Sequence, residues 1–489
     1  MALTILWHPA LVRVGQSAPL REGGTLEISR RTPPFDAATD VFLSRAPFLG
    51  IRLRAGGAEL SRLASAMPVE VAGQVLGESL WLTDADLRSG VILTLAGSVV
   101  ICLHACQLPI LRGPALGIVG GGDAIEAVRR QVSKVADLDV PVLIRGETGT
   151  GKELVARAIA SGGPRAPAPF VAINMAAIPA STATDELFGH ERGAFTGATE
   201  ARPGYFVEAD RGALFLDEVG ASSSDVQAML LRVLETGEIR ALGARKPRTV
   251  DVRVIAATDE NLEAAAAAGR FSEPLLHRLS GYQIMLPPLR DRRMDIGPLL
   301  LHSLRRELAA IGEADRLGPR DPTERPWLTA AEVARIASAP FPGNVRQLQN
   351  VARQIAISNR GQRFAELDEA VRAAIAGPAS TRGAAAPAGK SSRPPKVTDE
   401  QIGEALRRHN YNYSAAADDL GIHRSTLYDR LRANPQETRN ASELSDEEVL
   451  DAQARHGDDI AAMAAELRVS PKPLKARLTA ALTRRQGSS

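Results

Sequence analysis

The sequence predicts a multidomain chain with a β-rich N-terminal module, an α/β core with a helical lid, and an all-α tail. Three patterns support this division. Short apolar runs separated by turn residues fill the first 112 residues, apolar runs alternate with helical periodicity from residue 117, and helical periodicity alone dominates later. A length of 489 residues suits about three domains at ~150 residues each.

The first two regions differ in how their apolar runs are connected. Residues 1–112 contain LTILW, GIRLR, SLWLT and GVILTLAGSVVICLH between turns, which predicts an all-β module. Residues 117–260 alternate VPVLIRG, PFVAIN, GALFLDEVG and VRVIAATD with helical segments, which predicts a parallel sheet with crossover helices. Residues 262–360 are mainly helical and are predicted to form a lid on this sheet.

The last quarter of the chain begins with a tether and continues with an internal repeat. Residues 377–396 are rich in Pro, Gly, Ala and Ser and have almost nothing to bury. The segment from Thr398 then aligns without gaps on the segment from Ser445, pairing His409 with His456 and Leu420 with Leu467. We therefore predict two related helical units, 397–434 and 443–485.

The charge balance and the cysteine content limit the kinds of partner and the cellular compartments that suit this chain. The 59 basic and 57 acidic residues nearly cancel, so a surface for nucleic acid requires local clustering. No run approaches the ~18 apolar residues of a membrane span, and the N-terminus lacks a secretory signal, so we expect a cytoplasmic protein with no membrane partner. Cys102, His104 and Cys106 suggest a metal site, but the alternating apolar residues favour a strand with buried thiols.

Residues 140–160, VPVLIRGETGTGKELVARAIA, predict a strand, a glycine loop and a helix in that order. Their glycine and lysine spacing is that of a phosphate-binding loop, in which backbone N–H groups converge on phosphate oxygens and the lysine reaches the outer phosphates. ATP is the predicted ligand. Its predicted contacts are Gly146, Glu147, Thr148, Gly149, Thr150, Gly151, Lys152 and Glu153.

Two consecutive acids complete the predicted site. Glu153 stands where Ser or Thr usually places a hydroxyl on magnesium, so another ligand is required. Residues 212–220, GALFLDEVG, form an apolar strand that carries Asp217 and Glu218 to the sheet edge where the loop lies. Asp217 is predicted to hold Mg²⁺, directly or through water, and Glu218 to take a proton from the attacking water.

From residue 117 to about 360, and in its first tail repeat, the chain resembles the AAA+ family of bacterial enhancer-binding proteins, which activate RNA polymerase carrying sigma-54. The resemblance rests on motifs in the family's order: GETGTGKE, INMAAIP, DELFGHERGAFTGA, GYFVEADRGALFLDEVG, RVIAATDENL, LPPLRDRRMDI and FPGNVRQLQN. It implies an ATPase that self-associates into a ring, with a hexamer expected, and a phosphate loop that normally ends in the glutamate found at 153.

The resemblance also implies roles for single residues. Asn174 matches the residue that couples the catalytic glutamate to the rest of the domain, Thr258 lies in the first sensor strand, and Arg346 matches the second sensor arginine. Each of these roles is an expectation carried over from the family.

The family pattern in the segment GRFSEPLLHRL has two arginines, one of which reaches the neighbouring subunit's phosphates, an effect worth ~10³ or more in rate. Here Ser272 stands at the first position and Arg278 at the second. Arg278 is therefore the predicted trans residue. We hypothesise that Arg270 partly replaces the missing arginine, with a plain surface role as the alternative.

The family's GAFTGA loop projects from the ring and contacts sigma-54. The matching residues are Gly193, Ala194, Phe195, Thr196, Gly197 and Ala198. An exposed aromatic suits a partner surface, and the glycines let the turn bend, so Phe195 and Thr196 are the expected contacts. The alternative is a glycine turn with Phe195 folded into the core.

The first tail repeat has the layout of a helix-turn-helix, whose second helix enters the major groove. Small alanines, a turn at Gly421 and a helix start near His423 support it, and the stretch resembles a Fis-type tail. The predicted contacts to double-stranded enhancer DNA are His423, Arg424, Ser425, Thr426, Tyr428 and Arg430.

The second repeat is a less typical DNA reader, because Pro471 and Pro473 stiffen the start of its last helix. Lys472, Lys475 and Arg477 could still meet phosphates. Positioning of DNA and support of dimer packing both stay open.

The N-terminal module resembles a forkhead-associated domain, a β-sandwich that reads phosphothreonine. Ser44 and Arg45 match its Ser-Arg element, whereas Gln16 stands where an arginine is favoured, Pro47 near a favoured histidine and Ala72 at the usual asparagine. The resemblance implies a sensor module, with a phosphopeptide or kinase as the expected partner.

Two functions follow from these features. The first is an ATP-hydrolysing transcriptional activator that binds upstream DNA and remodels the closed complex of sigma-54 RNA polymerase. The second is a DNA-binding AAA+ regulator that represses or organises DNA without remodelling. The intact GAFTGA sequence favours the first.

Overall fold

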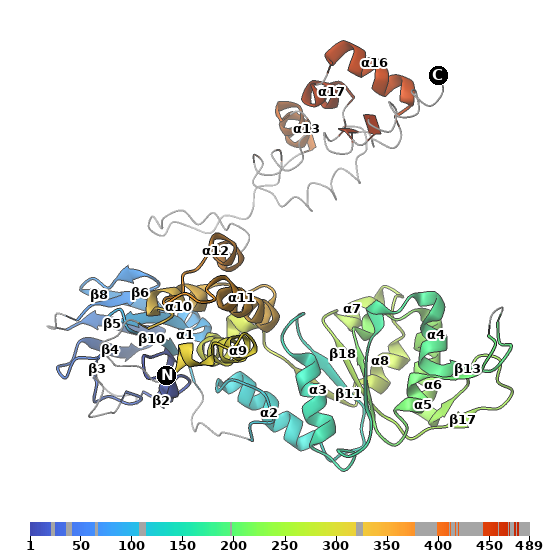
Figure 1. Ribbon diagram of the computed structural model, residues 1–489, viewed down its shortest axis with the longest axis horizontal. Helices are drawn as coiled ribbons and strands as arrows, with labels where there is room; N and C mark the ends of the chain where they lie inside the picture. Colours follow the sequence, from blue (N-terminus) through green and yellow to red (C-terminus); the bar gives the residue numbers. More distant parts are fainter. Residues whose placement is uncertain are drawn as a thin grey trace. The chain divides into compact units, whose positions relative to one another are not determined.

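The chain folds into two compact units, Met1–Thr381 and Arg382–Ser489. The computed structural model describes residues 1–20, 25–35, 42–63, 67–106, 114–195, 198–318, 326–376, 399–409, 411, 416, 419, 444–457, 459–467, 469, 474–475 and 477–478. The first unit contains a β-rich head, an α/β core and a helical lid (Figure 1). The predicted fold class is confirmed.

The head consists of two antiparallel sheets. Their strands are β1 (Ala2–Trp7), β2 (Ser17–Pro19), β3 (Thr25–Ile28), β4 (Leu49–Arg54), β5 (Gly57–Arg62), β6 (Val69–Val71), β7 (Gln74–Val75), β8 (Ser79–Thr83), β9 (Val91–Leu95) and β10 (Val99–His104), with helix α1 (Asp84–Ser89) after β8. The strand orders are β2-β1-β10-β9-β6-β7 and β3-β4-β5-β8. Apolar side chains from both sheets form one core, as in a sandwich.

Strands β1 and β10 are buried on both faces over their whole length. Leu3 and Ile101 point into the sandwich core, whereas Trp7, Val100 and Cys102 belong to a second cluster built mainly from lid helices. This explains why six consecutive residues of each strand are buried, since side chains of a strand alternate between its faces. The head and the lid therefore share one hydrophobic core.

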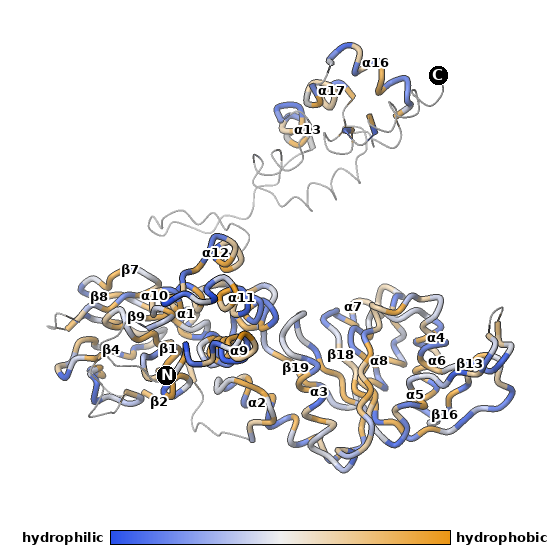
Figure 2. Tube along the Cα trace, in the orientation of Figure 1, coloured by the Kyte–Doolittle hydropathy of each residue, from blue (hydrophilic) through white to orange (hydrophobic). Residues whose placement is uncertain are grey.

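The α/β core is a parallel sheet with the order β12-β15-β18-β11-β19. Its strands are β11 (Val142–Arg145), β12 (Phe170–Asn174), β15 (Ala213–Asp217), β18 (Arg253–Thr258) and β19 (Tyr282–Met285). The central strand β18 is buried throughout, and Figure 2 shows its apolar character. Such continuous burial is expected when helices cover both faces of a parallel sheet.

Separate hydrophobic clusters cover the two faces. Helices α2 (Asp123–Val135) and α3 (Lys152–Ser161) pack on one face. The other face is covered by α4 (Ala180–Phe188), α5 (Tyr205–Glu208), α6 (Ser224–Thr236), α7 (Leu262–Ala267) and α8 (Glu273–Leu279). Two small hairpins, β13 (Gly189–His190) with β14 (Arg202–Pro203) and β16 (Glu238–Ile239) with β17 (Arg248–Thr249), extend from this second face.

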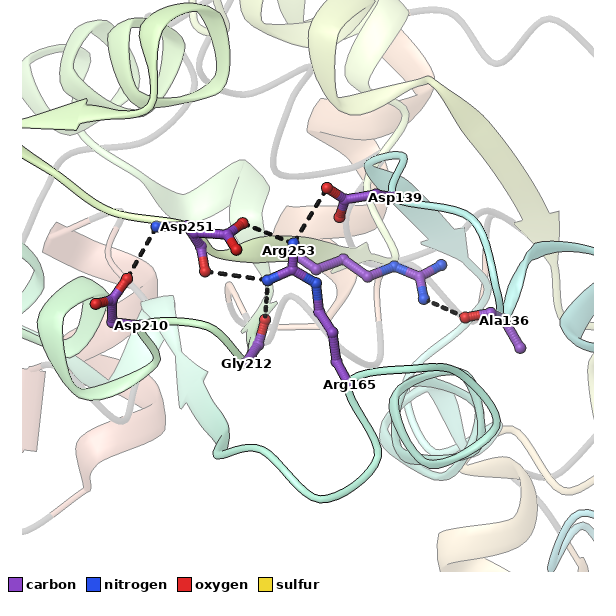
Figure 3. A network of polar contacts seen from close by, with 7 residues as sticks. All are labelled: Ala136, Asp139, Arg165, Asp210, Gly212, Asp251 and Arg253. Atoms are coloured by element: carbon purple, nitrogen blue, oxygen red, sulfur yellow. Dashed lines mark hydrogen bonds and ion pairs between the residues drawn. The ribbon is translucent and has the colours of Figure 1, made fainter.

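The amino-terminal edge of the sheet is tied together by two arginines (Figure 3). Arg253, at the start of β18, donates to the carbonyls of Ala136 and Val135 at the end of α2, at 2.7 and 2.6 Å. Arg165 contacts the carboxylates of Asp251 and Asp139 at 2.6 and 3.1 Å. These contacts satisfy terminal helix carbonyls and leave the opposite, carboxyl edge for the phosphate loop.

The lid comprises α9 (Ile296–Ala310), α10 (Ala330–Ser338), α11 (Asn344–Ser358) and α12 (Glu369–Ala376). Helices α9 and α10 contact head strands β1, β9 and β10 (Figure 1). The fit is close at Gly297, where an added Cβ would lie 2.2 Å from the carbonyl oxygen of Leu6. Only a glycine allows the two backbones to approach in this way.

The described helices of the tail lie at corresponding positions of the two predicted repeats. α13 (Asp399–Arg408) and α16 (Asp446–His456) begin at positions that the sequence alignment pairs, and α17 (Ile460–Leu467) follows α16. A histidine–carboxylate contact recurs at matched positions as well: His409 lies 3.2 Å from Asp419, and His456 lies 2.5 Å from Glu466. The two tail repeats therefore share the same histidine–carboxylate contact, although their sequences differ.

Replacing Gly297 with Ala is expected to destabilise the first unit, because the methyl group would collide with the backbone of Leu6. Overpacking of this kind costs about 1–3 kcal/mol and should lower the melting temperature of the full chain. Differential scanning calorimetry would measure this melting temperature. Gly77→Ala is the matched control, since a Cβ at Gly77 meets nothing within 4 Å. Equal melting temperatures for both variants would contradict the tight head–lid contact.

Candidate functional site

The loop between β11 and α3 has the backbone that a phosphate loop requires. Gly146, Gly149 and Gly151 have φ angles of 158°, 80° and 104°, in the region that favours glycine. Gly149 also lies against the lid, since a Cβ there would be 2.4 Å from the carbonyl oxygen of Gly343. Lys152 begins α3. The structure thus forms the predicted strand, loop and helix.

Several side chains of the loop contact protein groups. Lys152 donates to the carbonyl of Gly146 at 2.9 Å, and the Thr150 hydroxyl donates to the carbonyl of Glu147 at 2.7 Å. The Thr148 hydroxyl donates to Asp259 at 2.6 Å. At Glu147 and Thr148, the groups left for a bound phosphate are therefore backbone N–H groups.

The Glu147 carboxylate is held by Arg290, whose guanidinium donates to both of its oxygens at 2.8 and 2.6 Å. This hydrogen bonding keeps the pKa of Glu147 below its usual range. Arg290 lies within LPPLRDRRMDI, but no local pattern in the sequence pairs it with Glu147.

The two predicted acids lie where the sequence put them. Asp217 is the last residue of β15, and Glu218 follows it with a left-handed φ of 55°. One pocket brings these acids together with the loop and α11. It is lined by Thr148, Gly149, Gly151, Lys152, Glu153, Leu154, Asp217, Glu218, Val345, Arg346 and Gln349. Glycine backbone, a lysine, three carboxylates and a lid arginine thus line one cavity.

Of the remaining predicted residues of this region, Glu153 lines the pocket, whereas Asn174 and Thr258 lie at the ends of their strands. Asn174 pairs with Asp217 in the register of β12 and β15, and its Oδ1 accepts from the N–H of Ala176 at 2.9 Å. Thr258 is buried at the end of β18. The Glu153 carboxylate pairs with Arg157 at 2.7 Å, so it lines the pocket from the side of α3.

The segment that would face a neighbouring subunit has two exposed arginines. Arg278 pairs with Glu235 at 3.3 Å, and Arg270 pairs with Glu260 at 3.2 Å. Exposed pairs of this kind are weak, so both guanidinium groups can exchange partners. Ser272 is the N-cap of α8, where its hydroxyl accepts from the N–H of Leu275. The serine that replaces the family's arginine therefore has a structural role.

The GAFTGA segment is described except for Thr196 and Gly197. Phe195 is 48% exposed, and its ring meets the edge of the His190 ring at a centroid distance of 5.0 Å. The turn is closed by a hydrogen bond of 2.8 Å from the N–H of Gly193 to the carbonyl of Ala198. The alternative that Phe195 is folded into the core is wrong.

The base of this loop is held by the neighbouring hairpin β16–β17. The N–H of Leu242 donates to the carbonyl of Gly189 at 2.8 Å, and the N–H of Glu191 donates to the carbonyl of Leu242 at 2.9 Å. His190 contacts Asp185 at 2.5 Å. The loop tip is thus presented from a fixed base.

In the head, Ser44 and Gln16, two positions of the predicted forkhead-associated pattern, precede strands of different sheets. Gln16 precedes β2 of the six-stranded sheet, whereas Ser44 and the exposed Arg45 precede β4 of the other sheet. The residue beside Ser44 is Arg30, whose N–H donates to the Ser44 carbonyl at 2.9 Å. This backbone contact joins the chain just beyond the end of β3 to the segment that precedes β4.

The cysteine region forms the predicted strand, β10. Both ring nitrogens of His104 are engaged, one with the Thr4 hydroxyl and one with the Ala105 carbonyl, each at 2.8 Å. Burial raises the pKa of Cys102 to about 12. Over the described residues, no three His, Cys, Asp or Glu side chains gather as a metal site would require.

The tail residues predicted to contact DNA, His423, Arg424, Ser425, Thr426, Tyr428 and Arg430, lie outside the described residues. In the second repeat, Arg477 donates to Asp446 and, at 2.7 Å, to the carbonyl of Leu444. The Arg477 guanidinium therefore links the end of the second repeat to its start. Lys475 is exposed. Within the described part of the chain, no helix has the length and apolar character needed to cross a bilayer.

Two family models match this chain. Residues 118–285 match the sigma-54 interaction domain, and residues 396–433 match the bacterial regulatory protein, Fis family. The first match covers the phosphate loop, both acids and the GAFTGA segment. The second covers the predicted DNA contacts.

Individual relatives agree with these matches. NtrC from Escherichia coli K12 is 47% identical over 253 residues, which are 52% of each protein, so the chain spans about half the length of this relative. ZraR from Klebsiella oxytoca is 40% identical over 329 residues, covering 66% of this chain and 71% of ZraR. Among solved structures, NtrX from Brucella abortus is 31% identical with a TM-score of 0.47, covering 64% of this chain and 68% of NtrX. The chain therefore belongs to the family of sigma-54-dependent transcriptional activators, with a sigma-54 interaction domain and a Fis-type helix-turn-helix.

Proposed function

We propose that this protein hydrolyses ATP to remodel the closed complex of sigma-54 RNA polymerase from an upstream DNA site. One observation carries the proposal: a single pocket is lined by the glycine loop with Lys152, by Asp217 and Glu218, and by Arg346, while the same domain exposes Phe195 on a separate turn. A site for phosphate chemistry and a contact for a protein partner thus occur together.

The pocket suits ATP with magnesium. Lys152 is 7% exposed, so a largely buried lysine and the backbone N–H groups of the loop can bind the phosphates. Asp217 would hold Mg²⁺, directly or through water, and the bound ion would offset the negative charge of the phosphates. Glu218 takes the proton of the attacking water, and Asn174, beside Asp217 in the sheet, couples Glu218 to the rest of the domain.

Hydrolysis requires a second subunit in this proposal. Arg278 and Arg270 are exposed on the same segment, where they can reach the phosphates of a neighbour within a ring, with a hexamer as the expected assembly. ATP turnover then moves the Gly193–Ala198 turn, which contacts sigma-54 through Phe195 and Thr196.

The tail supplies the DNA partner. The first repeat binds double-stranded enhancer DNA through the six residues from His423 to Arg430 named above, and Lys475 of the second repeat can add a phosphate contact. These partners imply action in the cytoplasm. The head senses the signal, and a phosphopeptide would meet it at Ser44 and Arg45 with Arg30 beside them.

A repressor or DNA organiser without remodelling is the second candidate function. Both candidate functions require the ATP pocket and the tail, so only the GAFTGA turn distinguishes one function from the other. The exposure of Phe195 favours the activator, because a non-remodelling protein has no need to present that ring.

Replacing Glu218 with Gln is expected to lower ATP hydrolysis by about 10²–10⁴-fold, because the amide cannot accept the proton of the attacking water. Binding of a non-hydrolysable ATP analogue should persist. Steady-state turnover and calorimetric titration measure the two effects. The control is Glu208→Gln, an exposed glutamate of α5. Wild-type turnover in Glu218→Gln would refute the assigned base.

Replacing Arg278 with Ala is expected to lower turnover by ~10³, and Arg270→Ala to lower it less, because each removes a positive charge from a shared site. Wild-type specific activity should rise with protein concentration as the ring assembles. Arg306→Ala, at an exposed arginine of α9, is the control. An unchanged rate in Arg270→Ala would remove its proposed role.

Replacing Thr196 with Ala is expected to abolish open-complex formation with purified sigma-54 polymerase while ATP turnover continues. The loop contact is lost, but the pocket is not altered. Thr199→Ala, just beyond the motif, is the control. Equal promoter opening by wild type and Thr196→Ala would exclude the turn as the working contact and favour the repressor.

A further inference from the structure

Asn344 is a buried polar residue with three hydrogen bonds around the phosphate loop. Its Oδ1 accepts from the N–H of Leu289 at 2.8 Å. Its Nδ2 donates to Oε2 of Glu147 and to the carbonyl of Thr148, both at 3.1 Å. Asn344 is 0% exposed, so each of these side-chain bonds would be costly to leave unmade.

Glu147 and Arg290 complete the arrangement. The Glu147 carboxylate receives Nδ2 of Asn344 and both terminal nitrogens of Arg290. We name Asn344, Glu147 and Arg290 the loop clasp. An amide is the suitable group at position 344, because a carboxylate there would face the carboxylate of Glu147 and could not donate to the Thr148 carbonyl.

The backbone at this point also requires a particular residue. Asn344 has a left-handed φ of 52°, a conformation that asparagine adopts more readily than most residues. It is the first residue of α11. The N–H of Arg346, in the same turn, donates to the carbonyl of Gly149 at 3.2 Å. The start of α11 is therefore fastened to the phosphate loop by both side chain and backbone.

We propose that Asn344 is a positioning residue for ATP turnover, which acts by fixing the first turn of α11 on the phosphate loop. This places Arg346 in the pocket with Lys152, Asp217 and Glu218. The proposal rests on the proposed ATP hydrolysis and adds a residue that does not itself meet the nucleotide. Asn344 sets the distance between the lid arginine and the loop.

The test uses three variants of the full chain. Asn344→Gly removes the side chain and keeps the left-handed backbone available, and Asn344→Asp keeps the acceptor but removes the donors. Asn350→Gly is the matched control, because it makes the same substitution at an exposed site of α11 and carries the usual cost of glycine in a helix.

Both Asn344 variants are expected to weaken the binding of a non-hydrolysable ATP analogue and to raise KM by roughly 10- to 100-fold, the range for losing hydrogen bonds to charged or buried partners. Asn344→Asp should be the weaker binder, because its charge repels Glu147. Asn350→Gly should stay within about twofold of wild type. Wild-type KM in Asn344→Gly, or an equal rise in Asn350→Gly, would overturn the proposal.

A double-mutant cycle with Arg346→Ala distinguishes positioning from general stability. If Asn344 acts through Arg346, adding Asn344→Gly to Arg346→Ala should change KM by less than about twofold. If the two substitutions instead raise KM by fully multiplicative factors, the Asn344 side chain acts independently of Arg346, and its assignment as a positioning residue is refuted. A wild-type chain without ATP turnover at any protein concentration would instead refute the proposed function, which separates the two failures.

Discussion

The close contact between the phosphate loop and the start of α11 governs the arrangement of the whole site. Gly149 and Gly343 approach so closely that neither loop nor lid could move inward, and Arg346 is bonded through its backbone to the loop. The acids on β15 and the lid arginine meet in one pocket only because this contact holds. Hydrogen bonds at this contact can also rearrange when the ligand of the loop changes.

The head is attached to the lid by hydrophobic packing, whereas the lid is attached to the phosphate loop by hydrogen bonds. Leu6, Trp7 and Cys102 lie in one apolar cluster with the residues of α9 to α11, so burial holds the head in place. Strands β1 and β10 have no polar face to turn towards solvent. The head therefore packs directly on the lid, and the lid is in turn bonded to the phosphate loop.

The sequence predicted the elements that depend on local pattern. The phosphate loop, the acids at the end of β15 and the matched starts of α13 and α16 follow from glycine spacing, apolar runs and an internal alignment. Contacts between distant segments could not be predicted in this way. The partners of Glu147 lie more than 140 residues away, and no local pattern pairs Arg290 or Asn344 with that carboxylate. Likewise, the burial of β1 on both faces depends on a lid that follows it by nearly 300 residues.

The shared cluster of head and lid holds two of the three tryptophans of the chain, Trp7 and Trp327, whereas Trp81 is 46% exposed on β8. Indole emission depends strongly on the polarity around the ring. Two of the three indole rings therefore lie at one junction, and a separation of the head from the lid would expose both to water and change the intrinsic fluorescence of the protein.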